Sequence, residues 1–372
     1  MDIRGKFNTA KIMVEDADYA SLQQIKSLCN MEILSDSKIR IMGDVCPAIG
    51  TTIGSTFTYN NKIIPSLVSG DIGCGIITCK LKNKNIEVEQ VDKIMKEQII
   101  ARKRIDNVVD KYSSMINLKD LTCSKYIDID RCYNKLAELG GGNHFCELNK
   151  DSDKNIWITV HSGSRLLGQQ VYDFYLNEGY NLIKKINPGY SRLYTYLEGQ
   201  LMKDYLHDAE IVQRFADLNR RAIIDVIVKG TKNKITDEYS SIHNYVDANN
   251  KIIRKGAISA LEGEKLVIPI SASPVYGGVI IGYGLGNEEW NNSAPHGAGR
   301  ICSRSEAKNM FTANQYKKEM DGVFSSCINS SSIDESPMVY KRLDYIKESL
   351  KDIVVIEEVL KPFYNFKNGS KK

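Results

Sequence analysis

The sequence contains no uninterrupted run of about 18 to 20 apolar residues, which is the length that a membrane-spanning helix needs. Its first residues, MDIRGKF, also lack the apolar core of a secretory signal peptide. We therefore expect a protein without a membrane segment that resides in the cytoplasm.

Paired cysteine spacings are missing as well. Nine cysteines are present, an odd number, and none of them forms a CxxC pair. This pattern suits neither a disulfide framework nor a zinc ribbon, so we expect reduced thiols. The formal net charge is only +4 over 372 residues, which permits a nucleic-acid partner without indicating one.

No internal repeat, low-complexity tract or linker interrupts the chain, so we predict a single α/β domain over residues 1–372, in which β-sheets pack with helices. Residues 43–81 and 265–287 combine apolar runs with glycine turns, which is typical of short strands. The apolar spacing over 88–114 and 201–223 predicts two helices, and IWITV at 156–160 predicts a buried strand. A helix near 341–351 and a strand at 352–360 complete the expected pattern.

Four of the five histidines lie among glycine, serine or asparagine residues rather than on apolar faces: His144, His161, His243 and His296. Small neighbours let the backbone come close to a metal ion or a phosphate. A hydrogen-bonded loop histidine is the alternative for any one of them, but four together favour a common site. His207 lies on the polar flank of the predicted helix over 201–223, and we interpret it as a surface residue.

The segment SGDIGCGI places Asp71 and Cys74 three residues apart at a glycine turn between two apolar strands. Both side chains can then point at one atom, and carboxylate, thiolate and imidazole are common donors for divalent metal ions. The alternative is a structural cysteine buried in a tight turn. Residue types alone leave the identity of the metal open.

The segment SAPHGAGR places His296 and Arg300 on either side of two glycines. A neutral imidazole nitrogen can attack an activated phosphoryl group, and a nearby guanidinium can stabilise the charge that develops. The alternative for Arg300 is an ordinary salt bridge at the start of a helix. The glycine run 140–142 before Asn143 could likewise hold a phosphate, although a glycine run alone is weak evidence.

Taken in order, the motifs DIGCGI, GGGNHFCEL, VHSGSRLLG, HN, GLGNEEWNNSAPHGAGRICSR and a C-terminal Lys367 near Gly369 resemble the RtcB family of RNA-splicing and RNA-repair ligases, in a divergent bacterial-type branch. The resemblance implies the α/β fold of that family. It also implies an enzyme that uses GTP and manganese to join RNA 3'-phosphate or 2',3'-cyclic phosphate ends to 5'-hydroxyl ends, in RNA repair or tRNA splicing.

The resemblance assigns a role to each matching position. Two manganese ions would be held by Asp71, Cys74, His144, His161 and His243, with Cys74 between the ions. His296 would carry the GMP, while the role of Arg300 in stabilising the developing charge is inferred from the SAPHGAGR segment itself. The positions matched to the nucleotide or to the polar lining of the site are Asn143, Glu147, Arg165, Asn244 and Lys367.

Two stretches depart from the family pattern. Residues 268–278 read IPISASPVYGG where members often have IPGSMG, and Cys46 and Ile49 stand where many members have histidine and lysine. A metal-dependent phosphoesterase without a covalent nucleotide, and a non-catalytic RNA-binding protein, are the alternative functions. We expect a monomer whose partners are RNA and GTP, with a helper protein as a further candidate.

Overall fold

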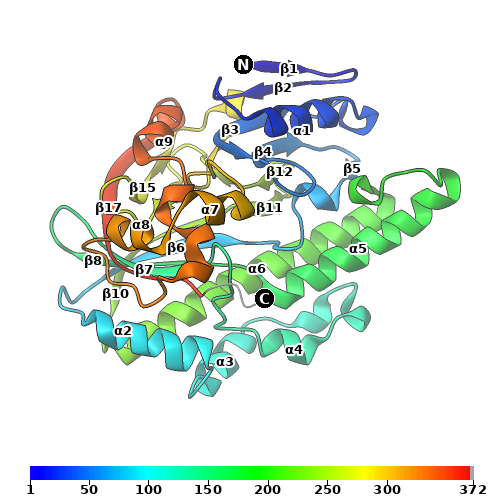
Figure 1. Ribbon diagram of the computed structural model, residues 1–372. Coiled ribbons are helices and arrows are strands. Elements are labelled where there is room, and N and C mark those ends of the chain that lie inside the picture. The colour runs from blue at the N-terminus through cyan, green and yellow to red at the C-terminus, as the bar shows by residue number, and fades with distance from the viewer. Residues whose placement is uncertain (369–372) are drawn as a thin grey trace.

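The computed structural model describes residues 1–368 and has a mixed α/β architecture (Figure 1). Its α-helices are α1 (Tyr19–Cys29), α2 (Val88–Ile94), α3 (Asp106–Ser113), α4 (Ile129–Tyr133), α5 (Arg165–Ile186), α6 (Gly199–Gly230), α7 (Arg304–Met310), α8 (Ala313–Glu319) and α9 (Leu343–Leu350). The α/β class expected from the sequence is confirmed.

One sheet in the described part of the chain has six strands, in the spatial order β1-β2-β3-β4-β12-β11. These strands are β1 (Asp2–Arg4), β2 (Thr9–Ile12), β3 (Ile39–Cys46), β4 (Ile53–Thr58), β12 (Ile252–Lys255) and β11 (Asn244–Asp247). Helix α1 contacts β1 and β2 at the edge of this sheet, near the N-terminus (Figure 1).

The second main sheet within residues 1–368 has seven strands, in the order β10-β6-β8-β7-β17-β15-β14. These strands are β10 (Ile235–Ile242), β6 (Gly75–Leu81), β8 (Ile156–Ser162), β7 (Phe145–Lys150), β17 (Val354–Phe366), β15 (Gly278–Gly284) and β14 (Lys265–Ser271). Every pairing in it is antiparallel. The two remaining pairs are β13 (Ala257–Ser259) with β16 (Ser293–Pro295), and β5 (Lys62–Ile63) with β9 (Leu197–Glu198).

Helix α6 is the main helix against the seven-stranded sheet. It is 32 residues long, contacts β6 and β8, and buries an apolar face that includes Tyr205, Val212, Phe215 and Ile223. Helix α5 runs beside α6, and the pair projects to the right in Figure 1. Because burial of large apolar side chains is the main source of folding free energy, α6 anchors the sheet edge that carries the site described below.

The predicted strands and the long helix are confirmed, whereas one predicted helix is wrong as a single element. The segment 88–114 forms α2, a π-helical stretch (Met95–Ile100), a break at 101–105 and then α3. Arg102 and Arg104 in the break have φ of 56° and 58°, a left-handed conformation that cannot continue a right-handed helix. Within residues 1–368, no helix has both the length and the apolar composition to cross a membrane.

Candidate active site

Four of the predicted ligands come together because four neighbouring strands end at the same edge of the seven-stranded sheet. Cys74 immediately precedes β6, His144 immediately precedes β7, His161 lies at the end of β8, and His243 immediately follows β10. The antiparallel register aligns Ile76 and Phe145 with His161 on either side of β8. Residues about 170 positions apart in the sequence therefore meet at one point.

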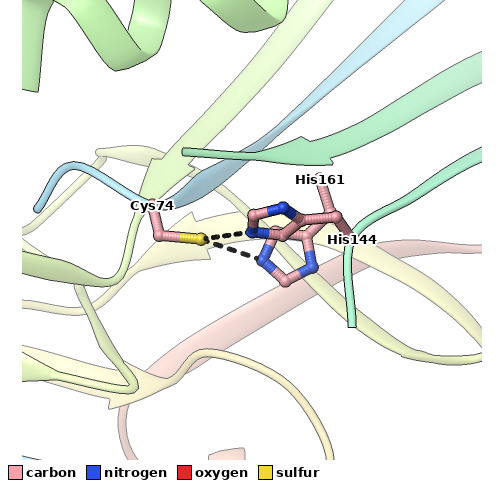
Figure 2. A group of neighbouring side chains, drawn as sticks. All are labelled: Cys74, His144 and His161. Carbon is pink, nitrogen blue, oxygen red and sulfur yellow. Dashed lines mark hydrogen bonds between the residues drawn. The ribbon is translucent and has the colours of Figure 1, made fainter. Parts of the chain in front are cut away.

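The Cys74 thiol lies at the centre of this group. Its Sγ is 3.3 Å from Nε2 of His144 and 3.2 Å from Nε2 of His161 (Figure 2). All three donor atoms lie within 4.8 Å of one another. Asp71 Oδ2 is 3.3 Å from His144 Nε2, and the His243 ring is 5.0 Å from the His161 ring between centroids. The arrangement offers sulfur, nitrogen and oxygen donors to a common centre, as a metal site requires.

Helix α6 fixes the loops that carry these ligands. The buried guanidinium of Arg220 donates through one nitrogen to the carbonyl oxygens of Gly73, at 2.7 Å, and Ser162, at 2.9 Å. A Cβ at Gly163 would lie 2.1 Å from Oδ1 of Asp71, so only glycine lets Asp71 approach the group. The spacing of the donors is thus set by the helix as well as by the sheet.

Burial keeps two of the imidazoles, those of His161 and His243, in their ligating form. It lowers the pKa of His161 and of His243 well below the usual value, and the neighbouring histidines add to this effect. Burial, together with the charge of Asp71, raises the pKa of the Cys74 thiol. Nδ1 of His161 lies 3.1 Å from the carbonyl oxygen of Asn143, to which its N–H donates. Nε2 then carries no proton and is free to bind a metal ion. A cation would convert the thiol to the thiolate, so the donor set fits a divalent metal ion.

His296 lies beside this cluster but in a different setting. Its ring centroid is 4.6 Å from that of His243. Oδ2 of the fully buried Asp44 lies 2.6 Å from its Nδ1 and also accepts its backbone N–H at 3.1 Å. A carboxylate on Nδ1 holds the proton there and leaves Nε2 with a free lone pair, which is the form of a nucleophilic imidazole.

A cavity of about 260 Å³ joins His161 and His296 to a set of polar side chains. The polar and charged residues in its lining are Asn143, Glu147, Ser271, Arg300, Arg304, Tyr340, Asn365 and Lys367. Both stretches that depart from the family pattern contribute to it, through Cys46 and through Pro269 to Ala272, whereas Ile49 is 75% exposed and lies outside it.

Of the remaining predicted residues, Arg165 and Glu147 lie at the site, whereas Asn244 lies outside the cavity lining. Arg165 lies at the metal cluster, where one guanidinium nitrogen is 3.1 Å from Nδ1 of His144 and another is 3.5 Å from Glu138. Glu147 is buried at the cavity and accepts from Asn149 and Asn365. Asn244 lies outside the lining, and its side-chain oxygen accepts the N–H of Gly256.

His207, interpreted as a surface residue, has a side chain that is 54% exposed. Gly369 lies outside the described residues.

Several residues of this site were missed from the sequence, among them Asp44, Arg304, Tyr340 and Asn365. Asp44 lies two residues before Cys46, but a strand aspartate carries no signal of its partner 252 residues away. Arg304 and Tyr340 lie in the cavity wall through contacts with Asp334 and Glu335, which only the folded chain brings together. No local pattern around His296 identifies these residues as members of the site.

Comparison with known proteins agrees with the motifs and the geometry. A family model described as "tRNA-splicing ligase RtcB" matches residues 107–368. The chain belongs to the RtcB family. A protein of Escherichia coli K12 named "RNA-splicing ligase RtcB" is 31% identical over 360 residues, which cover 86% of this chain and 87% of that protein.

The other RtcB-family relatives extend to archaea. "RNA-splicing ligase RtcB1" of Escherichia coli ATCC 25922 is 30% identical, with 86% of this chain and 87% of that protein covered. The "tRNA-splicing ligase RtcB" of Archaeoglobus fulgidus is 22% identical, with 92% and 90% covered. The similarity therefore runs through most of the chain and includes the segments that carry the cluster and His296.

Proposed function

We propose that this protein is an RNA ligase that uses GTP and manganese to join RNA 3'-phosphate or 2',3'-cyclic phosphate ends to 5'-hydroxyl ends. The observation that carries the proposal is the position of His296, which is held by Asp44, adjoins the Cys74 cluster and lines a cavity with Arg300 and Lys367. An imidazole whose Nδ1 is held by a carboxylate presents Nε2 as a nucleophile towards an activated phosphoryl group.

In the proposed reaction, Nε2 of His296 attacks the α-phosphorus of GTP, so an N–P bond forms and pyrophosphate leaves. The GMP then passes to an oxygen of the RNA 3'-phosphate as the N–P bond breaks. Finally the 5'-hydroxyl oxygen attacks the phosphorus of that 3'-phosphate, and GMP leaves. A 2',3'-cyclic end must first be opened by water to a 3'-phosphate.

The residues of this chain have distinct tasks in that sequence. Asp44 retains the Nδ1 proton and stabilises the positive charge that His296 gains on phosphorylation. Arg300 and Lys367 present positive charge to the nucleotide, and Asn143 and Glu147 offer it hydrogen bonds from the same cavity.

Asp71, Cys74, His144, His161 and His243 would hold the two divalent ions. Bound ions would neutralise phosphate charge. Manganese is proposed from the resemblance, because sulfur and nitrogen donors by themselves also suit zinc. We propose that the protein acts as a monomer in the cytoplasm, on RNA alone or with a helper protein.

Incubation with GTP labelled at the α-phosphate, followed by denaturation, tests the proposal. The manganese-loaded protein should retain label and the His296→Ala variant should not, whereas His207→Ala, on the exposed flank of α6, should label normally. Label on His296→Ala would overturn the covalent mechanism. Loss of phosphate from RNA ends without any labelled protein would identify a phosphoesterase instead. Metal analysis of the purified protein decides between manganese and zinc.

A further inference from the structure

A buried carboxylate lies directly behind the wall of the cavity. Glu335 is the last residue of the 3₁₀ segment η8 (Ser330–Glu335) and is 5% exposed. It does not line the cavity itself. An isolated carboxylate in such a position would be costly, so its partners explain why it is there.

Four side chains that do line the cavity converge on Glu335. Its Oε1 contacts the Arg304 guanidinium and lies 3.8 Å from that of Arg300. Its Oε2 accepts a hydrogen bond from the Tyr340 hydroxyl and lies 3.5 Å from Nζ of Lys367. Lys367 also donates to the backbone carbonyl of Glu335 at 3.0 Å. We call these five residues, with Asp334, the charged wall.

The balance of charge in the charged wall depends on this one residue. In it, three cations (Arg300, Arg304 and Lys367) face two carboxylates (Asp334 and Glu335), and Glu147 lines the cavity near Lys367. Without Glu335 the charged wall would keep one carboxylate, Asp334, which pairs with Arg304. Lys367, which is 8% exposed, would lose its nearest counter-ion.

We propose that Glu335 is a positioning residue of the nucleotide pocket, which holds Lys367 and the two arginines in the orientation and charge that binding of GTP requires. The inference rests on the proposed function. Glu335 acts only through the four side chains that it holds, because these stand between it and the cavity.

The protonation of Lys367 gives this role a measurable signature. Burial lowers the pKa of Lys367, and the carboxylates of Glu335 and Glu147 oppose that effect, while Arg300 adds to it. The Tyr340 ring lies 5.1 Å from Nζ on another side. From the adjoining loop, the thiol of Cys327 contacts the Lys367 backbone. Loss of the Glu335 charge should therefore lower the Lys367 pKa further, so that the lysine loses its proton at a lower pH.

Calorimetry of GTP binding between pH 6.5 and 8.5 tests the inference. The metal-loaded His296→Ala protein is used, because it cannot react with GTP. The range ends below the pH at which guanine itself loses a proton. With Glu335 present, affinity should stay nearly constant over this range. With Glu335→Gln added, affinity should be lower and should fall further toward pH 8.5, by at most about the tenfold that a pKa lowered by about one unit allows.

Asp247→Asn is the matched control, because it breaks a buried ion pair with Arg254 (2.9 Å) outside the cavity. It should lower stability without changing affinity for GTP. Equal affinity and pH profile in Glu335→Gln and its parent would overturn the inference, as would a similar loss in Asp247→Asn. Absence of GTP binding in the parent protein would instead overturn the proposed function, and the inference with it.

A variant that keeps the charge covers the case in which Glu335→Gln does not fold. Glu335→Asp shortens the side chain by one methylene, so it should weaken GTP binding about two- to fivefold through lost contacts while the pH profile stays flat. Unchanged affinity in Glu335→Asp would overturn the positioning role.

Discussion

At one end of the cavity, a thiol and three imidazoles meet at the edge of a single sheet, whereas at the other end arginines, a lysine and carboxylates meet between loops. The metal end is formed by Asp71, Cys74, His144, His161 and His243, and burial favours the neutral form of Cys74, His161 and His243. The charged wall contains five ionised side chains that compensate one another.

This difference indicates two kinds of binding site. At the metal end only Asp71 is charged beforehand, and the Cys74 thiol gives up its proton when a cation arrives. The charged wall is already charged and ordered before a ligand enters, so it needs little rearrangement to bind one. Loss of one group should therefore be close to all-or-none at the metal end and graded at the charged wall.

The largest effect is expected at the metal end. Cys74→Ala should weaken manganese binding by more than about 100-fold, since even the outer partners of metal ligands are worth about 10- to 100-fold. Covalent labelling by GTP should disappear with it. Metal content after dialysis and the labelling assay measure both.

Cys79→Ala is the control for this change, because Cys79 is a buried thiol within β6, the strand that Cys74 immediately precedes. It should keep both metal and label. Normal metal content in Cys74→Ala would show that the thiol is not a metal ligand, and would contradict the distinction between the metal end and the charged wall.

The next largest effect is expected at His296, between the metal end and the charged wall. Asp44→Asn removes the charge from the carboxylate on Nδ1 of His296 and should slow GMP transfer to the histidine by roughly 10²- to 10⁴-fold, while metal content stays normal. Single-turnover labelling measures the rate. Asp208→Asn, which alters another fully buried carboxylate, tests whether a loss of stability alone slows labelling. Equal rates in the parent and Asp44→Asn would contradict the role given to Asp44.

A smaller effect is expected from the support beneath the metal end. Arg220→Met leaves the carbonyls of Gly73 and Ser162 without their donor, and should lower the free energy of unfolding by about 2 to 4 kcal/mol and metal affinity by about tenfold. Urea unfolding and metal titration report the two quantities.

The neighbouring Arg221→Met removes a half-exposed arginine that pairs with Asp217 and Glu238, and should cost only about 0 to 1 kcal/mol. If the two arginine variants lose the same stability, Arg220 does not support the loops as described.

The smallest effect is expected at the charged wall. Arg304→Met removes a side chain that is 47% exposed, so solvent screens its charge, and the KM for GTP should rise only about two- to fivefold with little change in kcat. Arg342→Met, which removes an arginine stacked on Tyr276 outside the cavity, should leave KM unchanged. Complete loss of activity in Arg304→Met would show that the charged wall is not graded.

Local sequence was sufficient for much of this description. Glycine residues beside apolar runs predicted the turn that carries Asp71 and Cys74, and the small-residue contexts of four histidines marked them as site residues. These features are readable because they depend on neighbours in the chain. The break at 101–105 was missed, because apolar spacing continues through it while the backbone does not.

The sequence by itself therefore determined the family, through motifs whose order matches RtcB, and with it the residues that we propose carry the chemistry. Only the tertiary structure decided which of these residues form the metal end and which belong to the charged wall. The register of β10, β6, β8 and β7 gathers the metal end, and the pairing of β7 with β17 brings Lys367 beside Glu147. Asp44 and Glu335 are invisible in sequence because a carboxylate acquires its role from the cation or imidazole that folding places against it, and that contact spans as many as 252 residues.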